Sequence, residues 1–168
     1  MIRRFLLSLS LVTLALVVQS TWLDAIAIRS VIPDLALLVL VFISFHSPSL
    51  QGQAVGFVAG FLQDGISAGP LGLNSFVKTA IAWSFNALSG KFYIDRILMP
   101  LLFGFAATLL KALYYALLYW IFGDKVQAYN FLSAYLWIEA GYNAFLAPVL
   151  FLLLSPIKRF LVAREISS

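Results

Sequence analysis

The sequence predicts an all-α protein embedded in a membrane, with six transmembrane helices in a single domain that covers residues 1–168. Two observations predict this. Of the 168 residues, 62% are hydrophobic and 11% are charged, and the mean hydropathy is +0.99, which leaves too little polar surface for a soluble domain. The apolar residues also form long continuous runs rather than alternating ones, which favours helices over the closed barrel that lipid also permits.

The first predicted helix covers Phe5 to Leu23, an uncharged stretch that follows Arg3-Arg4. A cleaved signal peptide is the alternative, with Val18-Gln19-Ser20 as a tolerable cleavage site, but the apolar stretch is long for one. The second helix, Pro33 to Phe45, and the third, Gln51 to Ile66, are short of the ~20 residues that a full crossing needs. We therefore expect both to be tilted, extended into the flanking residues, or partly buried in protein.

The remaining predicted helices cover Leu73 to Leu88, Ile97 to Phe122 and Ala134 to Leu154. A turn at residues 46–50 separates the second helix from the third, and we expect its His46 to be a solvated turn residue. The sequence has no cysteine and one histidine, so it excludes disulfides, thiolate nucleophiles and Cys- or His-rich metal sites. We predict no metal and no cofactor.

The distribution of basic residues predicts which side of the membrane the termini occupy. Six helices place both termini on one side, which then holds seven basic residues, while the other side holds only Arg29 and Lys125. This bias is typical of a cytoplasmic face. Five helices are disfavoured because they would place the two basic ends of the chain on opposite sides. The seven residues are Arg3, Arg4, Lys91, Arg96, Lys158, Arg159 and Arg164.

Three glycines in the third predicted helix, Gly52, Gly56 and Gly60, recur every four residues, and Asp64 follows at the same interval. On a helix these positions lie along one face. Small residues at this spacing let two helices approach closely in a membrane. The spacing leaves open whether the second helix belongs to this chain or to another protein.

A turn is predicted between the third and fourth helices, on the outer side of the membrane, at residues 65–72. Gly65 and Gly69 relax the backbone, and Pro70 cannot continue a helix but can begin one. Gly72 and Asn74 then lie in the first turn of the fourth helix. We expect the N–H groups of this helix end to face a polar cleft or the water boundary.

Five ionisable residues lie within or at the ends of the predicted helices, where a central charge costs about 2.5–3.5 kcal/mol. Asp34, directly after Pro33, and Asp64 lie near the outer boundary and are interpreted as helix caps there. Lys78 lies close enough to the outer end of its helix for its ammonium to reach water.

Lys111 and Glu139 are harder to place at a boundary. Lys111 lies near the middle of the fifth predicted helix, and Glu139 lies several residues into the sixth. We hypothesise an ion pair between them, because helices adjacent in sequence tend to be antiparallel neighbours. Asn143 lies one turn beyond Glu139 on the same face and would extend a polar seam.

The membrane aspartates raise the possibility of an intramembrane aspartyl protease, but the GxGD motif is missing. Phe61-Leu62-Gln63 precede Asp64, and Pro33 precedes Asp34. A serine peptidase would need a serine paired with a base. We therefore expect no enzyme. An aromatic cluster around the end of the fifth helix favours an interfacial belt over a ligand cage; its members are Tyr114, Tyr115, Tyr119, Trp120, Tyr129, Tyr135 and Trp137.

Four segments in fixed order carry a family resemblance. They are Ile32-Pro33-Asp34-Leu35-Ala36-Leu37-Leu38, the segment 56–64 that ends in Gln63-Asp64, Gly69-Pro70-Leu71-Gly72-Leu73-Asn74, and Tyr142-Asn143-Ala144-Phe145-Leu146-Ala147-Pro148. Together with the chain length and helix count, this order resembles MreD, the rod shape-determining membrane protein of bacteria. The likeness extends over nearly the whole sequence.

The resemblance implies a non-enzymatic scaffold in the inner membrane that supports cell elongation and peptidoglycan synthesis. Its implied partners are MreC, the actin-like MreB, the glycosyltransferase RodA and an elongation-specific penicillin-binding transpeptidase. It also implies a fold similar to the six-helix substrate-binding subunits of energy-coupling-factor (ECF) vitamin transporters.

Two hypotheses about the polar and glycine residues follow from the resemblance. In the first, the glycine-lined third helix forms a groove for the membrane anchor of a partner such as MreC, with outer contacts at residues 65–72. In the second, the chain is a solute-binding transporter subunit. Asp34, Asp64, Asn74 and Lys78 would then converge on a ligand.

Overall fold

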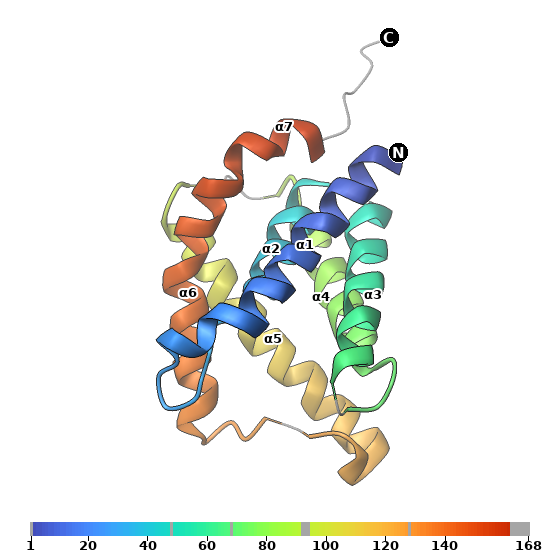
Figure 1. Cartoon of the computed structure of the whole chain (residues 1–168), viewed down its shortest axis with the longest axis vertical. Helices are drawn as coiled ribbons and strands as arrows, with labels where there is room; N and C mark the ends of the chain where they lie inside the picture. The colour runs from blue at the N-terminus through green and yellow to red at the C-terminus, as the bar shows by residue number, and fades with distance from the viewer. Residues whose placement is uncertain (1, 48, 68, 92–94, 128, 162–168) are drawn as a thin grey trace.

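Six long helices form a bundle in the computed structural model, which describes every residue except 1, 48, 68, 92–94, 128 and 162–168 (Figure 1). The prediction of an all-α fold is confirmed for this part of the chain, where the only extended pairing is a bridge between Ile28 and Val31. The helices are α1 (Ile2–Trp22), α2 (Leu35–His46), α3 (Ser49–Ile66), α4 (Leu73–Leu88), α5 (Leu98–Phe122), α6 (Ala134–Leu154) and the short α7 (Lys158–Leu161). Three short 3₁₀ turns cover Leu23–Ile26, Gly123–Lys125 and Ser155–Ile157.

Helix α2 lies at the centre of the bundle and contacts α1, α3, α4, α5 and α6. Every residue from Ala36 to Phe45 is buried, as expected of a helix that is apolar on all sides. Its 12 residues extend only about 18 Å, whereas the hydrocarbon core of a bilayer is about 30 Å thick. Val31, Pro33 and Asp34, which lead into it, are buried in an extended segment. Non-helical backbone at such a depth is tolerated where protein surrounds it.

Two hairpins make the most extensive helix contacts, α3 with α4 and α5 with α6. Helix α1 packs on α2 and α3, where the Gln51 side chain donates a 2.9 Å hydrogen bond to the Ser8 hydroxyl. The beginning of α1 and the end of α6 lie at the same end of the bundle, where α7 contacts α1 (Figure 1).

Three helical stretches of the described residues are long and apolar enough to cross a membrane, Ile2–Trp22, Leu98–Lys125 and Ala134–Leu161. Large apolar side chains on their outer faces are exposed, for example Leu14 (60%) and Phe145 (77%). Contiguous apolar surface of this kind is rare in soluble proteins and suits a lipid environment. The length and composition of these helices therefore agree with the predicted membrane location.

Candidate functional site

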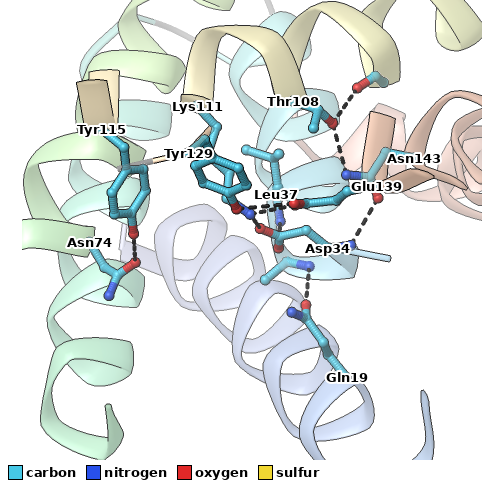
Figure 2. Close-up of polar contacts among 12 residues, drawn as sticks. Gln19, Asp34, Leu37, Asn74, Thr108, Lys111, Tyr115, Tyr129, Glu139 and Asn143 are labelled. Atoms are coloured by element: carbon cyan, nitrogen blue, oxygen red, sulfur yellow. Dashed lines mark hydrogen bonds and ion pairs between the residues drawn. The ribbon is translucent and has the colours of Figure 1, made fainter. Parts of the chain in front are cut away.

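The interior of the bundle contains an ion-pair network centred on Lys111 of α5. Its Nζ lies 2.7 Å from Oδ2 of Asp34, the N-cap residue of α2, and 2.6 Å from Oε1 of Glu139 on α6. Figure 2 shows the three side chains converging from three helices. The Lys111–Glu139 pair predicted from the sequence is therefore present, and Asp34 makes it a triad.

Tyr129, in the segment between α5 and α6, covers this triad. Its hydroxyl donates a 3.0 Å hydrogen bond to Oε2 of Glu139, and the Lys111 ammonium lies 5.6 Å from the centre of its ring. Burial raises the pKa of the Tyr129 phenol. The Glu139 carboxylate also raises it, while the Lys111 ammonium lowers it by a smaller amount than burial raises it. The phenol is therefore protonated and acts as a donor.

Asn143 joins the triad to the buried backbone at the start of α2. Its Oδ1 accepts a 2.8 Å hydrogen bond from the backbone N–H of Asp34, and its Nδ2 donates a 2.9 Å bond to Oγ1 of Thr108. Thr108 in turn donates to the carbonyl of Gly104 (3.0 Å), and the Asp34 carboxylate accepts from the N–H of Leu37 (3.0 Å). Asn143 thus extends the polar seam from Glu139, as predicted. It also accepts from the buried N–H of Asp34, which has no partner within a helix.

Asp64, near the end of α3, forms a second polar centre at the N-terminus of α4. Its carboxylate accepts hydrogen bonds of 2.9–3.2 Å from the backbone N–H groups of Gly72, Asn74 and Ser75. It also accepts from the Asn74 amide and the Ser75 hydroxyl, each at 3.0 Å. A negative charge at a helix N-terminus is favourable, so Asp64 acts as the cap of the neighbouring helix rather than of its own.

The glycine stripe of α3 faces other helices of this chain. A Cβ atom at Gly52 would lie 2.8 Å from the Ser44 hydroxyl on α2, and one at Gly56 would lie 2.9 Å from the Lys78 carbonyl on α4. A Cβ at Gly60 would overlap the backbone of Asn74 and Ser75. The stripe therefore packs internally, and α4 occupies the position where a partner's membrane anchor had been hypothesised to lie.

The polar contacts join four sequence segments in two pairs. Residues 32–38 meet residues 142–148 through the Asp34–Asn143 hydrogen bond, and residues 56–64 meet residues 69–74 through Asp64 and Asn74. Helix α5 links the two pairs, because Lys111 binds Asp34 and the Tyr115 hydroxyl donates a 2.7 Å bond to Oδ1 of Asn74 (Figure 2). These are the segments that carry the family resemblance.

A protein-family model described as rod shape-determining protein MreD matches residues 1–157. The chain belongs to the MreD family. No curated protein and no solved structure matches it. MreD-family membership makes this a bacterial membrane protein with a role in determining rod shape. In this member of the MreD family, the paired segments therefore supply hydrogen bonds that connect the helices.

Two predicted positions of side chains in this MreD protein are wrong. Lys78 does not extend to the water boundary, because it is 4% exposed and its backbone packs against Gly56 of α3. Its ammonium makes no hydrogen bond or ion pair with another described residue, although Asp34 and Asp64 act on it at longer range.

His46 is not a solvated turn residue either. It is the last residue of α2, and its Nδ1 lies 2.8 Å from the Phe42 carbonyl oxygen.

The charges buried in the interior nearly cancel. Asp34 and Glu139 are balanced by Lys111 and Lys78, while Asp64 is satisfied by the N-terminus of α4. Charged groups in a membrane interior are tolerated when they are paired, as Asp34, Lys111 and Glu139 are, while Lys78 contributes its charge at longer range.

The aromatic cluster divides into two groups. Trp120 (85% exposed) and Trp137 (51%) suit the predicted interfacial belt. Tyr114, Tyr115 and Tyr129 instead point inward, and the hydroxyl of Tyr114 lies 2.8 Å from that of Ser84 on α4. The hydroxyls of all three bond to groups on or between the helices, so the belt prediction is wrong for them.

Sequence reasoning missed Thr108, Gln19 and Ser75 as network members. Thr108 lies three residues before Lys111, on the same face of a helix, so the periodicity of α5 contained a signal for it. Gln19 of α1 accepts a 3.4 Å hydrogen bond from the N–H of Ala36, a contact that no local pattern indicates. Ser75 is adjacent to Asn74, which the sequence did predict.

Gly69 and Pro70 lie exposed in the predicted turn. Gly72 has a φ of 92°, a backbone conformation that favours glycine.

Proposed function

We propose that this protein is a non-enzymatic scaffold of the cell-elongation (rod) complex in the bacterial inner membrane. It crosses the membrane six times, keeps both termini in the cytoplasm, and organises peptidoglycan synthesis through MreC. RodA, an elongation-specific penicillin-binding transpeptidase and MreB belong to the same complex. The single observation that carries the proposal is that the four family segments are joined in two pairs. Hydrogen bonds connect Asp34 with Asn143 and Asp64 with Asn74.

This closure supports a structural role because the costly polar groups are used to join helices. Lys111 binds α2, α5 and α6 together, and Asp64 binds α3 to α4. Each carboxylate is engaged by an ammonium, a hydroxyl or backbone N–H groups in positions fixed by packing. Such networks rigidify a body when every member is satisfied, which is what an assembly scaffold requires.

The contact with MreC is best placed at the turn between α3 and α4. The glycine stripe packs against α2 and α4, so it offers no groove to a partner helix. Ile66, the last residue of α3, and Leu71, which lies in the turn before α4, are 76% and 75% exposed. Apolar side chains exposed at the end of a bundle, beside a polar rim, are typical of interaction sites.

The test replaces Leu71 with aspartate and measures how much MreC co-purifies from a rod-shaped host. A charge placed in a buried contact is expected to reduce recovery about tenfold. Leu132→Asp is the matched control, because Leu132 is 95% exposed in the segment between α5 and α6. Depletion of the protein is expected to round the cells.

Recovery that is equal for Leu71→Asp and Leu132→Asp would place the contact elsewhere. Normal rods after depletion would overturn the scaffold role itself. The alternative of a solute-binding transporter subunit gains no support from the family match, which describes rod-shape determination.

A further inference from the structure

A cavity of about 740 Å³ opens where the α3–α4 turn faces the segment between α5 and α6. Its lining combines tyrosines with uncharged polar side chains, including Asn74, Tyr115, Gln127, Tyr129, Asn130 and Tyr135. A second hollow of about 620 Å³ shares Gln127, Tyr129 and Asn130 with it, so the two form a continuous groove. This size is within the range of small-molecule sites. The groove shares the α3–α4 turn with the proposed MreC contact, but its lining does not include Ile66 or Leu71.

Three tyrosine rings form one wall of the cavity. The ring centres of Tyr115 and Tyr129 are 5.8 Å apart, and those of Tyr129 and Tyr135 are 6.2 Å apart. Figure 2 shows the hydroxyl of Tyr115 directed at Asn74 and that of Tyr129 directed at the Lys111–Glu139 pair. These bonds fix the two rings before any ligand arrives. Such preorganised aromatic surface is available for stacking, because a ring face carries partial negative charge that attracts C–H groups.

The opposite edge of the cavity offers hydrogen-bonding groups without net charge. Gln127 is exposed and makes no hydrogen bond with another described residue, and the Asn130 side chain uses only its oxygen, on the N–H of Leu132. Asp124 and Lys125 contribute one charge of each sign. The lining therefore fits a neutral ligand that combines an apolar ring face with hydroxyl and amide groups on its rim.

We propose that this groove binds an N-acetylated amino sugar, either in a glycan strand or in its lipid-linked precursor. A pyranose ring presents C–H groups on its face to the tyrosines, while its hydroxyl and acetamido groups reach Gln127 and Asn130. The choice of sugar rests on the proposed function, since a scaffold of wall synthesis lies beside such chains. A peptide from a partner is the competing occupant, but the fixed ring wall and free amides favour the sugar.

The test is saturation-transfer NMR with diacetylchitobiose, a disaccharide of N-acetylglucosamine, on the full chain in lipid nanodiscs. We expect saturation to reach the ring C–H protons of the sugar first. Tyr135→Ala should weaken the dissociation constant roughly threefold to tenfold, while Tyr135→Phe retains it. Tyr135 is suited to this because its side chain is 46% exposed and contributes no hydrogen bond to the buried network.

Gln127→Ala should also weaken binding, and Gln53→Ala on α3, away from the cavity, is the matched control. The two sources of sugar are separated by repeating the titration with a polyprenyl-diphosphate-linked disaccharide in the nanodisc. Tighter binding of the lipid-linked probe assigns the precursor, and equal binding assigns the glycan strand.

The proposal is overturned if the wild-type protein shows no transfer at millimolar sugar, or if Tyr135→Ala binds as well as Tyr135→Phe. It is also overturned if a photo-cross-linking residue at position 127 captures a protein while neither sugar probe binds. None of these outcomes affects the recovery of MreC, so failure of the sugar site and failure of the scaffold proposal are distinguishable.

Discussion

At the scale of single residues, Lys111 is the group that makes two buried carboxylates compatible with the bundle. Asp34 and Glu139 approach from α2 and α6, and both lie within 3 Å of the same ammonium. Without it, two negative charges would share a site that is shielded from water. Removing one member of a buried ion pair costs more than the pair contributes, because the remaining charge is left uncompensated.

Lys111→Met should therefore lower the free energy of unfolding by about 3–5 kcal/mol. The measurement is an unfolding titration in mixed micelles followed by tryptophan fluorescence. Lys125→Met is the control, since Lys125 is exposed and should be close to neutral. The triple variant Lys111→Met, Asp34→Asn, Glu139→Gln should recover part of the loss. An unchanged Lys111→Met protein would mean that the triad is not buried as the structure describes.

The sequence predicted part of this network for a physical reason. Glu139 and Lys111 lie on consecutive helices, so their pairing followed from local topology alone. The addition of Asp34 depends on how residues 27–34 return into the bundle, which is set by tertiary packing. Lys78 was misplaced because the argument for reaching water assumes a lipid-facing side chain, whereas this one is buried inside the bundle.

At the scale of helices, the sequence predicted all six, and the largest error at an end is three residues, at the start of α1 (Phe5 predicted, Ile2 observed). Local backbone signals explain this accuracy, because Pro33-Asp34 marks the beginning of α2 and Gly69-Pro70 separates α3 from α4. The partner of the glycine stripe was not predictable. Periodicity gives the face of a helix but not the helix that packs on it.

The close packing of α3 on α4 predicts opposite effects for two glycines of one helix. Gly60→Ala should lower the free energy of unfolding by about 1–3 kcal/mol, because the new methyl group overlaps the backbone at Asn74 and Ser75. Gly65→Ala meets nothing within 4 Å and should be neutral or stabilising by up to about 1 kcal/mol, since alanine favours helix. The same fluorescence titration measures both. Equal effects at the two positions would contradict the α3–α4 contact.

At the scale of the whole molecule, the two hairpins and α1 enclose a short central helix that could not persist alone in a bilayer. Helix α2 is apolar on every face, yet it reaches only part of the way through the hydrocarbon. Its buried N-terminal end is completed by side chains from α5 and α6, Lys111 and Asn143. The central helix therefore depends on contacts with α1, α3, α4, α5 and α6.

The same arrangement predicts the orientation of the chain in the membrane. The start of α1 and the end of α6 lie at one end of the bundle, and Arg3, Arg4, Lys158 and Arg159 lie there with them (Figure 1). Arg164, also counted on this side, lies outside the described residues. Basic residues near helix ends are retained in the cytoplasm, so both termini should be cytoplasmic.

A reporter fused after Ser168 measures this directly. Green fluorescent protein should fluoresce there, while alkaline phosphatase should be inactive, because the first folds in the cytoplasm and the second needs the oxidising side. The same reporters fused after Lys125, in the segment between α5 and α6, should give the reverse pattern. An active phosphatase after Ser168 would overturn the cytoplasmic assignment. If the phosphatase after Lys125 were then inactive, the six crossings would be inverted, whereas activity at both positions would contradict the passage of α6 across the membrane and with it the six-helix topology.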